Sequence, residues 1–369
     1  MLQYLDLMKD ILSKGVDRSD RTGTGRRSVF GRQLRFNLED GFPLVTTRKI
    51  SLEAIATELL WFLSGSTDNN ILNENNVSIW NRWAVKPDDV NKMLRKYAEE
   101  FKGNEEAFRS FFESQLNNLG PIYGMAWRDA PVKSIDLMAF WKTINIDDIP
   151  DDKKDYYEET YLAGIKAIEN ELADPGPQGI PERDVYYKSL YHSSVDQINE
   201  LVISLRDRPY SARHVVSAWI PEWLPFEDLS PQENVLIGKA ALAPCHALFQ
   251  CFVYPADINH LKPRLSLQLY LRSSDVPIGL PYNIAQYAML LSMLAKVSNY
   301  EPYELIVSLG DAHIYQDQIE DAKLQITRAP LPLPKLMLME VDNLFNFTKE
   351  DIFIDGYNHH DAINYRVSV

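Results

Sequence analysis

The sequence contains very little cysteine and no long apolar run. Its only two cysteines, Cys245 and Cys251, lie six positions apart, which is about 20 Å along an extended strand and too far for a disulfide between them. Neither has the His or Cys neighbours of a zinc site, so we predict no metal. No window approaches the ~18 consecutive apolar residues of a membrane-spanning helix, and we expect no membrane partner.

Basic residues are outnumbered by acidic ones. The 38 Lys and Arg against 52 Asp and Glu give a formal net charge of −14, which argues against DNA binding. A few arginines can still form a local pocket for a small anionic ligand. The N-terminal segment places acids between apolar residues and predicts an amphipathic helix over 2–14 rather than a secretion signal. We therefore expect a cytoplasmic protein.

Helical and strand-like patterns follow one another along the chain. Further helices are predicted over 51–65, where Ser51 is the expected N-cap, and over 283–298. Strands are predicted over 28–38, 247–255 and 264–275, from 303 into a Gly-Asp turn, and, after a turn, within 40–47. The predicted fold class is α+β, with a largely β core and long helices packed against it.

Two charged stretches interrupt these patterns. Residues 85–118 mix lysines with acids, and residues 130–192 are irregular and acidic. Neither contains a repeat or a low-complexity tract. We predict a single domain over 1–369 with surface insertions at about 85–118 and 130–192.

Both cysteines lie in the segment "ALAPCHALFQCFV" (241–253). A free cysteine in an apolar strand is most often an inert core residue. Pro244, however, indicates a strand start or a bulge just before Cys245. His246 is expected to point to the opposite face, so a reactive Cys245 would need an arginine to stabilise its thiolate. Cys251 is expected in the core.

Several other side chains have both a chemical and a purely structural interpretation. Arg272 in "YLRSSD" can grip a phosphate in a fork geometry or pair with Asp275. The basic, Gly-rich "DRTGTGRR" (20–27) can wrap a phosphate but lacks the spacing of known phosphate loops. Glu58, on the apolar face of its helix, either completes a buried polar network or does acid–base work.

Polar and aromatic residues farther along the chain extend this set. Asn283 either caps its helix or reads the amide-like edge of a base. His313 and Tyr315 share one side of a strand end and can bind hydroxyls. Trp80 and Trp83 are spaced to share a helix face, where they can stack on a planar ring or pack in the core. Together these residues suggest a nucleotide enzyme with an aromatic cosubstrate.

The chain resembles the thymidylate synthase family. Its segments "DRTGTG", "FNLEDGFPLVTT", "ELLWFLSGST", "NNVSIWNRWA", "LGPIYGMAWR", "ALAPCHALFQCFV", "LRSSDVPIGLPYNIAQYA" and "LGDAHIYQDQI" stand in the family's order. The resemblance covers nearly the whole chain outside the two insertions. It implies a large mixed β-sheet at a homodimer interface, and reductive methylation of dUMP to dTMP in which 5,10-methylenetetrahydrofolate supplies carbon and hydride.

The resemblance also implies residue roles. Cys245 would add to C6 of uracil, Glu58 would organise proton transfer through water, and Tyr123 would help remove the C5 proton. Asn283 would read the O4/N3 edge of the base. The phosphate would be held by Arg21, Arg272, Ser273 and the partner subunit's Arg213. The 3′-hydroxyl would be bound by His313 and Tyr315. The folate site would comprise Trp80, Trp83, Leu242, Gly279, Tyr282, the tail residue Val369 and Asp275, which would border both ligands.

The sequence departs from the family pattern at three positions. Ala212 replaces the first of two adjacent arginines, Leu271 stands where a glutamine is common, and Ser51 where a histidine is frequent. These changes bear on ligand affinity rather than on the carbon–carbon chemistry. Two rivals remain: a deoxyuridylate hydroxymethylase, in which water traps the methylene intermediate, and an inactive relative that serves as a nucleotide-binding or scaffold protein. Asn283 argues against a cytidylate enzyme, where an aspartate is expected.

Overall fold

The computed structural model describes residues 1–19, 23–98, 102–131 and 194–367. Its contacts divide the chain into two compact units, one made of Met1–Asp129 with Asp196–Val369 and the other of Ala130–Val195. In the second unit the described residues form two short antiparallel strands, β3 (Ala130–Pro131) and β4 (Ser194–Val195). Most of the stretch expected as the second insertion therefore lies outside the described residues.

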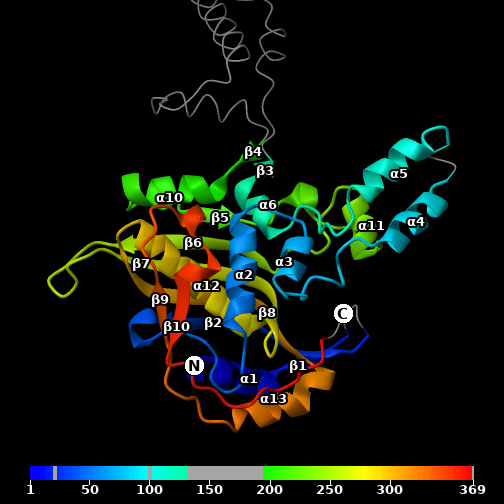
Figure 1. Ribbon diagram of the computed structural model, residues 1–369. Coiled ribbons are helices and arrows are strands. Elements are labelled where there is room, and N and C mark those ends of the chain that lie inside the picture. Colours follow the sequence, from blue (N-terminus) through cyan, green and yellow to red (C-terminus); the bar gives the residue numbers. More distant parts are fainter. Residues whose placement is uncertain (20–22, 99–101, 132–193, 368–369) are drawn as a thin grey trace, which may run out of the picture. The chain divides into compact units, whose positions relative to one another are not determined.

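The first unit is built on a six-stranded mixed sheet (Figure 1). Along the sheet the strands are β1 (Val16–Arg18), β2 (Arg26–Asn37), β8 (Glu301–Tyr315), β7 (Arg264–Asp275), β6 (His246–Tyr254) and β5 (Val215–Ser217). Neighbouring strands are antiparallel except β7 and β8, which are parallel. The α+β fold class and the main predicted strands are confirmed.

The turn predicted at Gly310-Asp311 is wrong, because β8 continues through both residues to Tyr315. Asp311 pairs with Phe30 of β2 on one side and with Ser273 of β7 on the other. Glycine is needed at position 310 because β8 comes close to the backbone of β7 there, and not because the chain turns. A Cβ atom there would lie 2.7 Å from the carbonyl oxygen of Arg272.

The two faces of the sheet differ in character. In β6, Phe249, Cys251 and Val253 point into the core, whereas Leu248 and Phe252 remain exposed. The predicted burial of Cys251 is therefore confirmed. In β7, Gln268 and Tyr270 are exposed between buried leucines.

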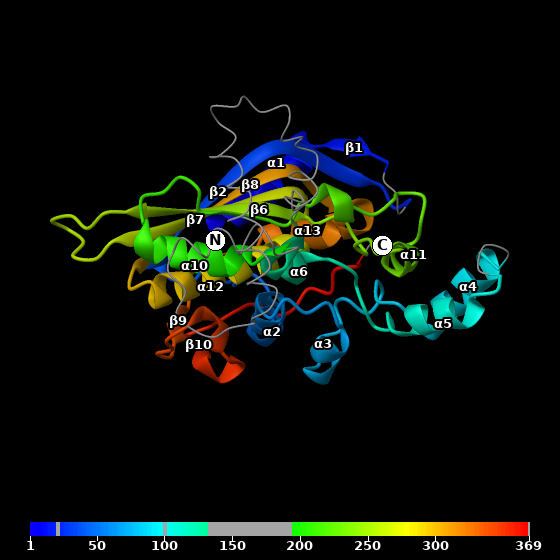
Figure 2. The same ribbon diagram turned by 90° about the horizontal axis from the view of Figure 1, so that it is seen from above.

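Helices cover the core face of the sheet. The long helix α12 (Gly279–Val297) packs on β7 and β8, α1 (Leu2–Lys14) packs on β2, and α2 (Leu52–Leu63) packs against α12. Figure 2 shows α10 (Gln197–Asp207) and α12 on the same side of the strands. The prediction of Ser51 as the N-cap of α2 is confirmed, since Ala54 N donates to Ser51 Oγ at 3.2 Å. No helix among the described residues is long and apolar enough to cross a membrane.

Helix α12 begins four residues earlier than predicted, at Gly279. Pro281 lies in its first turn, where backbone N–H groups have no helical acceptor and proline is tolerated. Asn283 is therefore inside the helix, and the interpretation of Asn283 as a helix cap is wrong.

The strand predicted within 40–47 is absent. Phe42 N donates to Pro334 O at 2.8 Å, and Leu331 N donates to Thr46 Oγ1 at 2.9 Å. His360 N donates to Thr46 O at 2.8 Å. The segment thus satisfies part of its backbone through single contacts with 331–334 and the C-terminal segment, without a strand ladder.

Shorter elements complete the first unit. The remaining helices are α3 (Asn70–Glu74), α4 (Pro87–Lys96), α5 (Glu105–Glu113), α6 (Tyr123–Arg128), α11 (Pro231–Leu236) and α13 (Ile319–Ile326). Strands β9 (Lys335–Leu338) and β10 (Ile352–Asp355) form a separate antiparallel pair. The 3-10 turns are η1 (Leu38–Asp40), η3 (Pro221–Trp223), η4 (Gln316–Gln318), η5 (Leu344–Asn346) and η6 (Lys349–Asp351). Residues 85–118, expected as the first insertion, thus carry the paired helices α4 and α5.

Candidate functional site

Cys245 immediately precedes β6 and is partly exposed. Its N–H donates to Tyr123 Oη at 2.8 Å, and its carbonyl oxygen accepts from Arg272 N at 3.0 Å. Burial raises the pKa of the Cys245 thiol, whereas the positive charge of Arg272 and a hydrogen bond from Tyr123 lower it. The arginine that a reactive Cys245 would need therefore lies beside it.

Arg272 projects from β7 toward the segment before β6. Its Nε donates to Pro244 O at 2.8 Å and its Nη2 to Ala243 O at 2.6 Å. The guanidinium also lies over the Trp219 ring, 5.5 Å from its centroid. An ion pair between Arg272 and Asp275, the structural alternative, is not found in the described part of the chain. Because a guanidinium carries five N–H donors, Arg272 retains donors for an anionic ligand.

A chain of hydrogen bonds and stacked rings continues from Cys245 into the core. His246 stacks on Tyr123, with ring centroids 4.5 Å apart. Asn283 Nδ2 donates to His246 Nε2 at 2.8 Å, and His246 Nδ1 lies 3.3 Å from Tyr287 Oη. Burial lowers the pKa of His246 to about 3, so the ring is neutral at pH 7. Its Nδ1 then carries the proton and donates to Tyr287.

Glu58 lies on α2, and its side chain is buried. Its Oε1 accepts from Trp80 Nε1 at 2.8 Å, and its Oε2 accepts from Gln286 Nε2 at 2.8 Å. Burial raises the pKa of Glu58 to about 7, although both hydrogen bonds lower it. Glu58 thus completes a buried polar network, which is the first of the two alternatives. Its pKa also suits proton transfer near neutral pH, and the acid–base role stays a prediction.

The two tryptophans lie close together, with centroids 5.6 Å apart in an edge-on arrangement. Their segment forms turns and is not helical, so the shared helix face predicted for them is wrong. Trp80 is buried, and Trp83 packs against the core while partly exposed. Leu242, also partly buried against the core, lies in the segment just before Cys245.

Asp275 ends β7 next to the start of α12. Its Oδ1 accepts from Ile278 N at 3.1 Å, and its Oδ2 accepts from Gln318 Nε2 at 3.1 Å. Burial raises the pKa of Asp275, and these hydrogen bonds partly counter the effect. Gln318 Nε2 also donates to Arg366 O at 2.9 Å, so Asp275 shares a donor with the C-terminal segment. Gly279 and Tyr282 lie in the first turns of α12.

His313 and Tyr315 lie at the end of β8, with ring centroids 5.1 Å apart. The prediction that they share one side of the strand end is confirmed. His313 is buried, and its Nδ1 lies 3.2 Å from Asp311 Oδ1. Ser273 is adjacent to Asp311 in the strand register.

Arg213, expected at the phosphate, is not brought to this cluster. Arg213 lies in the exposed loop before β5, and in the described ranges its guanidinium forms no ion pair. Arg21 and Val369 lie outside the described residues. Ala212 and the exposed Arg213 precede the buried His214.

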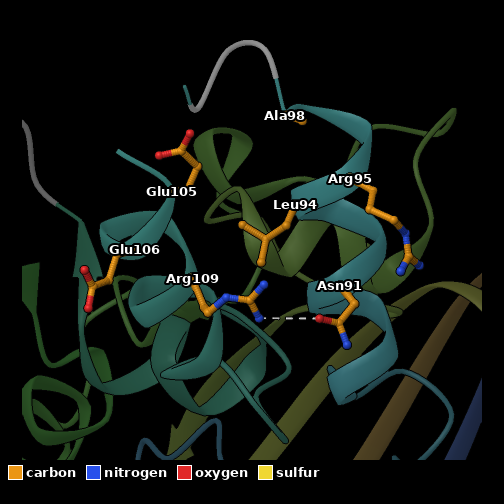
Figure 3. Close-up of a pocket in the computed structure, with 7 residues that line it drawn as sticks. All are labelled: Asn91, Leu94, Arg95, Ala98, Glu105, Glu106 and Arg109. Atoms are coloured by element: carbon orange, nitrogen blue, oxygen red, sulfur yellow. Dashed lines mark hydrogen bonds between the residues drawn. The ribbon is translucent and has the colours of Figure 1, made fainter. Parts of the chain in front are cut away.

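A separate cavity of about 490 Å³ lies between α4 and α5. Its lining comprises Asn91, Leu94, Arg95, Ala98, Glu105, Glu106 and Arg109 (Figure 3). Arg109 Nη1 reaches Asn91 Oδ1 at 3.5 Å, whereas Arg95 points away and the two glutamates point apart. Because these polar groups do not converge, we place the functional site at Cys245 and not here.

The sequence alone does not identify His246, Tyr287, Gln286 or Gln318 as members of this cluster. The alternation of side chains along a strand predicts only that His246 points away from Cys245, and it does not show that the His246 ring contacts Asn283. Gln286 carried a usable signal, since it is a polar residue inside the apolar run of α12. Gln318 gave none, because it falls in an irregular polar segment.

Comparisons with known proteins agree with this geometry. The family model described as "Thymidylate synthase" matches residues 2–369. The chain is 37% identical over 370 residues to "Thymidylate synthase" of Francisella tularensis subsp. holarctica strain FTNF002-00 / FTA, covering all of both chains. The corresponding protein of strain OSU18 matches equally well. The chain belongs to the thymidylate synthase family.

Members of the thymidylate synthase family are folate-dependent methyltransferases that convert dUMP into dTMP, and family membership assigns this reaction to the chain. The match is continuous from residue 2 to the C-terminus. The predicted family, fold and reaction are therefore confirmed.

Proposed function

We propose that Cys245 is the nucleophile that adds to C6 of dUMP. Its placement beside Arg272 and Tyr123, partly exposed at the start of β6, is the observation that carries this proposal. Thiolate addition converts C5 of uracil into an enolate carbon, which then attacks the methylene group of 5,10-methylenetetrahydrofolate. Loss of the C5 proton and of tetrahydrofolate leaves an exocyclic methylene. Hydride transfer from tetrahydrofolate and release of the thiolate give dTMP and dihydrofolate.

The phosphate of dUMP binds at Arg272 and Ser273, joined by Arg21 and the partner subunit's Arg213. Arg272 already holds two carbonyl groups near Cys245, so its orientation is fixed before substrate arrives. A preorganised guanidinium loses little conformational freedom when it grips a phosphate. Its charge also favours the thiolate form of Cys245.

Asn283 reads the O4/N3 edge of uracil. Its side-chain nitrogen has two hydrogens and donates to His246 Nε2, which leaves one N–H for O4 and the amide oxygen for the N3 proton. The neutral His246 therefore fixes which way the amide of Asn283 points. His313 and Tyr315, together at the end of β8, bind the 3′-hydroxyl of the deoxyribose.

Glu58 and Tyr123 move protons during the reaction. A carboxyl group with a pKa of about 7 exchanges protons readily at neutral pH. Glu58 acts through water, since Trp80 and Gln286 occupy both of its oxygens. The hydroxyl of Tyr123, which accepts from Cys245 N, helps to remove the C5 proton.

The folate binds beside this site, along Trp80, Trp83, Leu242, Asp275, Gly279 and Tyr282, and the tail that ends at Val369 closes over it. Support comes from the edge-on tryptophan pair and from Gln318, which joins Asp275 to the C-terminal segment. Excluding water protects the methylene intermediate until hydride arrives.

The protein acts as a homodimer through the exposed face of the sheet. Apolar side chains remain exposed there on β6 and β7 at Leu248, Phe252 and Tyr270. Large exposed apolar side chains on one face of a sheet favour an interface there. Arg213 in its exposed loop then serves the partner's phosphate site. We also propose that residues 1–369 form a single domain with surface insertions at about 85–118 and 130–192.

Product analysis tests the proposed reaction against its rivals. With dUMP and methylenetetrahydrofolate, the protein should form dTMP and dihydrofolate in equal amounts, and Cys245→Ser should form neither. Formation of 5-hydroxymethyl-dUMP with tetrahydrofolate would identify a hydroxymethylase. No turnover with intact dUMP binding would support the inactive relative.

A further inference from the structure

The buried carboxyl group of Glu58 is held by two donors of different kinds. Trp80, in the turn near residue 80, donates from Nε1 to Glu58 Oε1 at a distance of 2.8 Å. Gln286, on α12, donates from Nε2 to Glu58 Oε2 at a distance of 2.8 Å. Indole N–H can only donate, whereas a carboxamide can donate through nitrogen or accept through oxygen. The two partners therefore respond differently when Glu58 gains a proton.

Gln286 has few competing interactions. Its side chain is 1% exposed, and within the described residues its Oε1 has no hydrogen-bond partner. An unpaired buried acceptor is unfavourable, so its position beside a titrating carboxyl group calls for an explanation. Rotation of the amide by about 180° would exchange Nε2 and Oε1 and present the acceptor to Glu58.

A protonated Glu58 needs an acceptor for its O–H group. If only donors surrounded it, the acid would be left with a buried, unsatisfied hydrogen and would turn away from its site. The same amide that binds the carboxylate through Nε2 can bind the acid through Oε1 after rotating. Asn283, the proposed reader of the base, lies one turn before Gln286 on α12.

We propose that Gln286 is a positioning residue that holds the Glu58 carboxyl group in both of its protonation states, donating through Nε2 to the carboxylate and accepting through Oε1 from the acid. This inference rests on the proposed role of Glu58 in proton transfer. The other titratable groups that face this region are Tyr287 on α12, Tyr123 on α6 and the neutral His246 on β6. None of them carries a charge at pH 7.

Replacing Gln286 by methionine tests the proposal, because methionine is similarly long and unbranched but cannot donate an N–H. Loss of the donor to the carboxylate raises the pKa of Glu58, whereas loss of the acceptor for the acid lowers it. The hydrogen bond to the charged form is the stronger of the two, so the net change is a rise. The pH at which Glu58 titrates should therefore rise by about one unit, as read from its carboxyl stretch in infrared difference spectra. The Glu58→Gln variant assigns that band. Ser292→Ala, on the same helix, is the matched control and should leave the titration unchanged.

The pH profile of kcat should move in the same direction in the Gln286→Met variant, while KM for dUMP stays nearly constant. A merely structural role would lower kcat without moving the profile. A folded Gln286→Met protein in which Glu58 titrates at the wild-type pH would overturn the proposal.

A measurement on wild-type protein covers the case in which Gln286→Met does not fold. With 15N-labelled glutamine, the Gln286 side-chain amide resonance should shift with the titration of Glu58 and become independent of pH in Glu58→Gln. A wild-type resonance that ignores this titration would contradict the proposal. Because neither spectroscopic test needs turnover, failure of the proposed reaction would be seen separately, in the product assay.

Discussion

At the scale of single residues, the site depends on Cys245 and on the groups that decide its charge. Burial favours the neutral thiol, and the charge of Arg272 opposes that effect. The contrast with Cys251 is instructive, since burial raises its pKa to about 12 without a compensating charge. We therefore expect Cys245 to be the more reactive of the two, because Arg272 lies beside it.

This balance predicts a pH-dependent alkylation rate. Removing the positive charge in Arg272→Met removes an interaction that lowers the pKa of Cys245, so this pKa should rise. Iodoacetamide should then react more slowly at pH 7, with the rate rising only at higher pH. Cys245→Ser controls for labelling elsewhere. An alkylation profile unchanged by Arg272→Met would show that Arg272 does not stabilise the thiolate.

At the scale of elements, the strongest sequence patterns predicted the fold well. The helix over 2–14 and the strand over 264–275 match α1 and β7, because one apolar face of regular period specifies each. The irregular segment 40–47 depends on contacts with residues distant in sequence, such as Pro334 and His360. Local patterns contain no information about such partners.

The same limit applies to the site. Cys245, Arg272 and Glu58 were found because each is an unusual residue in an apolar or regular setting. The contacts of His246 with Asn283, and of Gln318 with Asp275, join segments that only the folded sheet brings together. The roles of Arg213 and Val369 depend on a partner subunit and on a tail, so they stay predictions.

The close approach of β7 and β8 makes Gly310 sensitive to substitution. In Gly310→Ala the new Cβ would lie 2.7 Å from Arg272 O, so strands must shift at a cost of about 1–3 kcal/mol. Urea denaturation should report this loss of stability. Gly279→Ala is the matched control for stability, since its Cβ would meet nothing closer than Asn283 Oδ1 at 3.9 Å. Equal stability of the two variants would contradict the strain.

At the scale of the whole molecule, the sheet has one face covered by helices and one with exposed apolar side chains. The proposed dimer would bury the second face and bring Arg213 to the partner's site. An enzyme of this design needs its interface for activity as well as for stability. Disrupting the dimer should therefore abolish turnover even when each subunit remains folded.

Phe252, which is 58% exposed on β6, provides the test. Phe252→Asp would place a charge in an apolar interface, which is strongly unfavourable without a partner, and should raise the dimer dissociation constant at least ~10-fold. Sedimentation equilibrium measures this change. Leu324→Asp, at a 50% exposed position on α13, should leave association unchanged. A wild-type monomer, or a Phe252→Asp dimer of unaltered affinity, would contradict the proposed interface.

The central claim is that the Cys245 thiolate adds to C6 of the pyrimidine. The most direct measurement is mass spectrometry of the peptides after incubation with 5-fluoro-dUMP and methylenetetrahydrofolate. In this analogue fluorine replaces the C5 hydrogen that a base must remove as a proton, so the reaction stops there and the covalent intermediate accumulates. The account predicts one adduct per chain, carrying both ligands on Cys245 and absent from Cys245→Ser. No adduct, or an adduct on another residue, would contradict it.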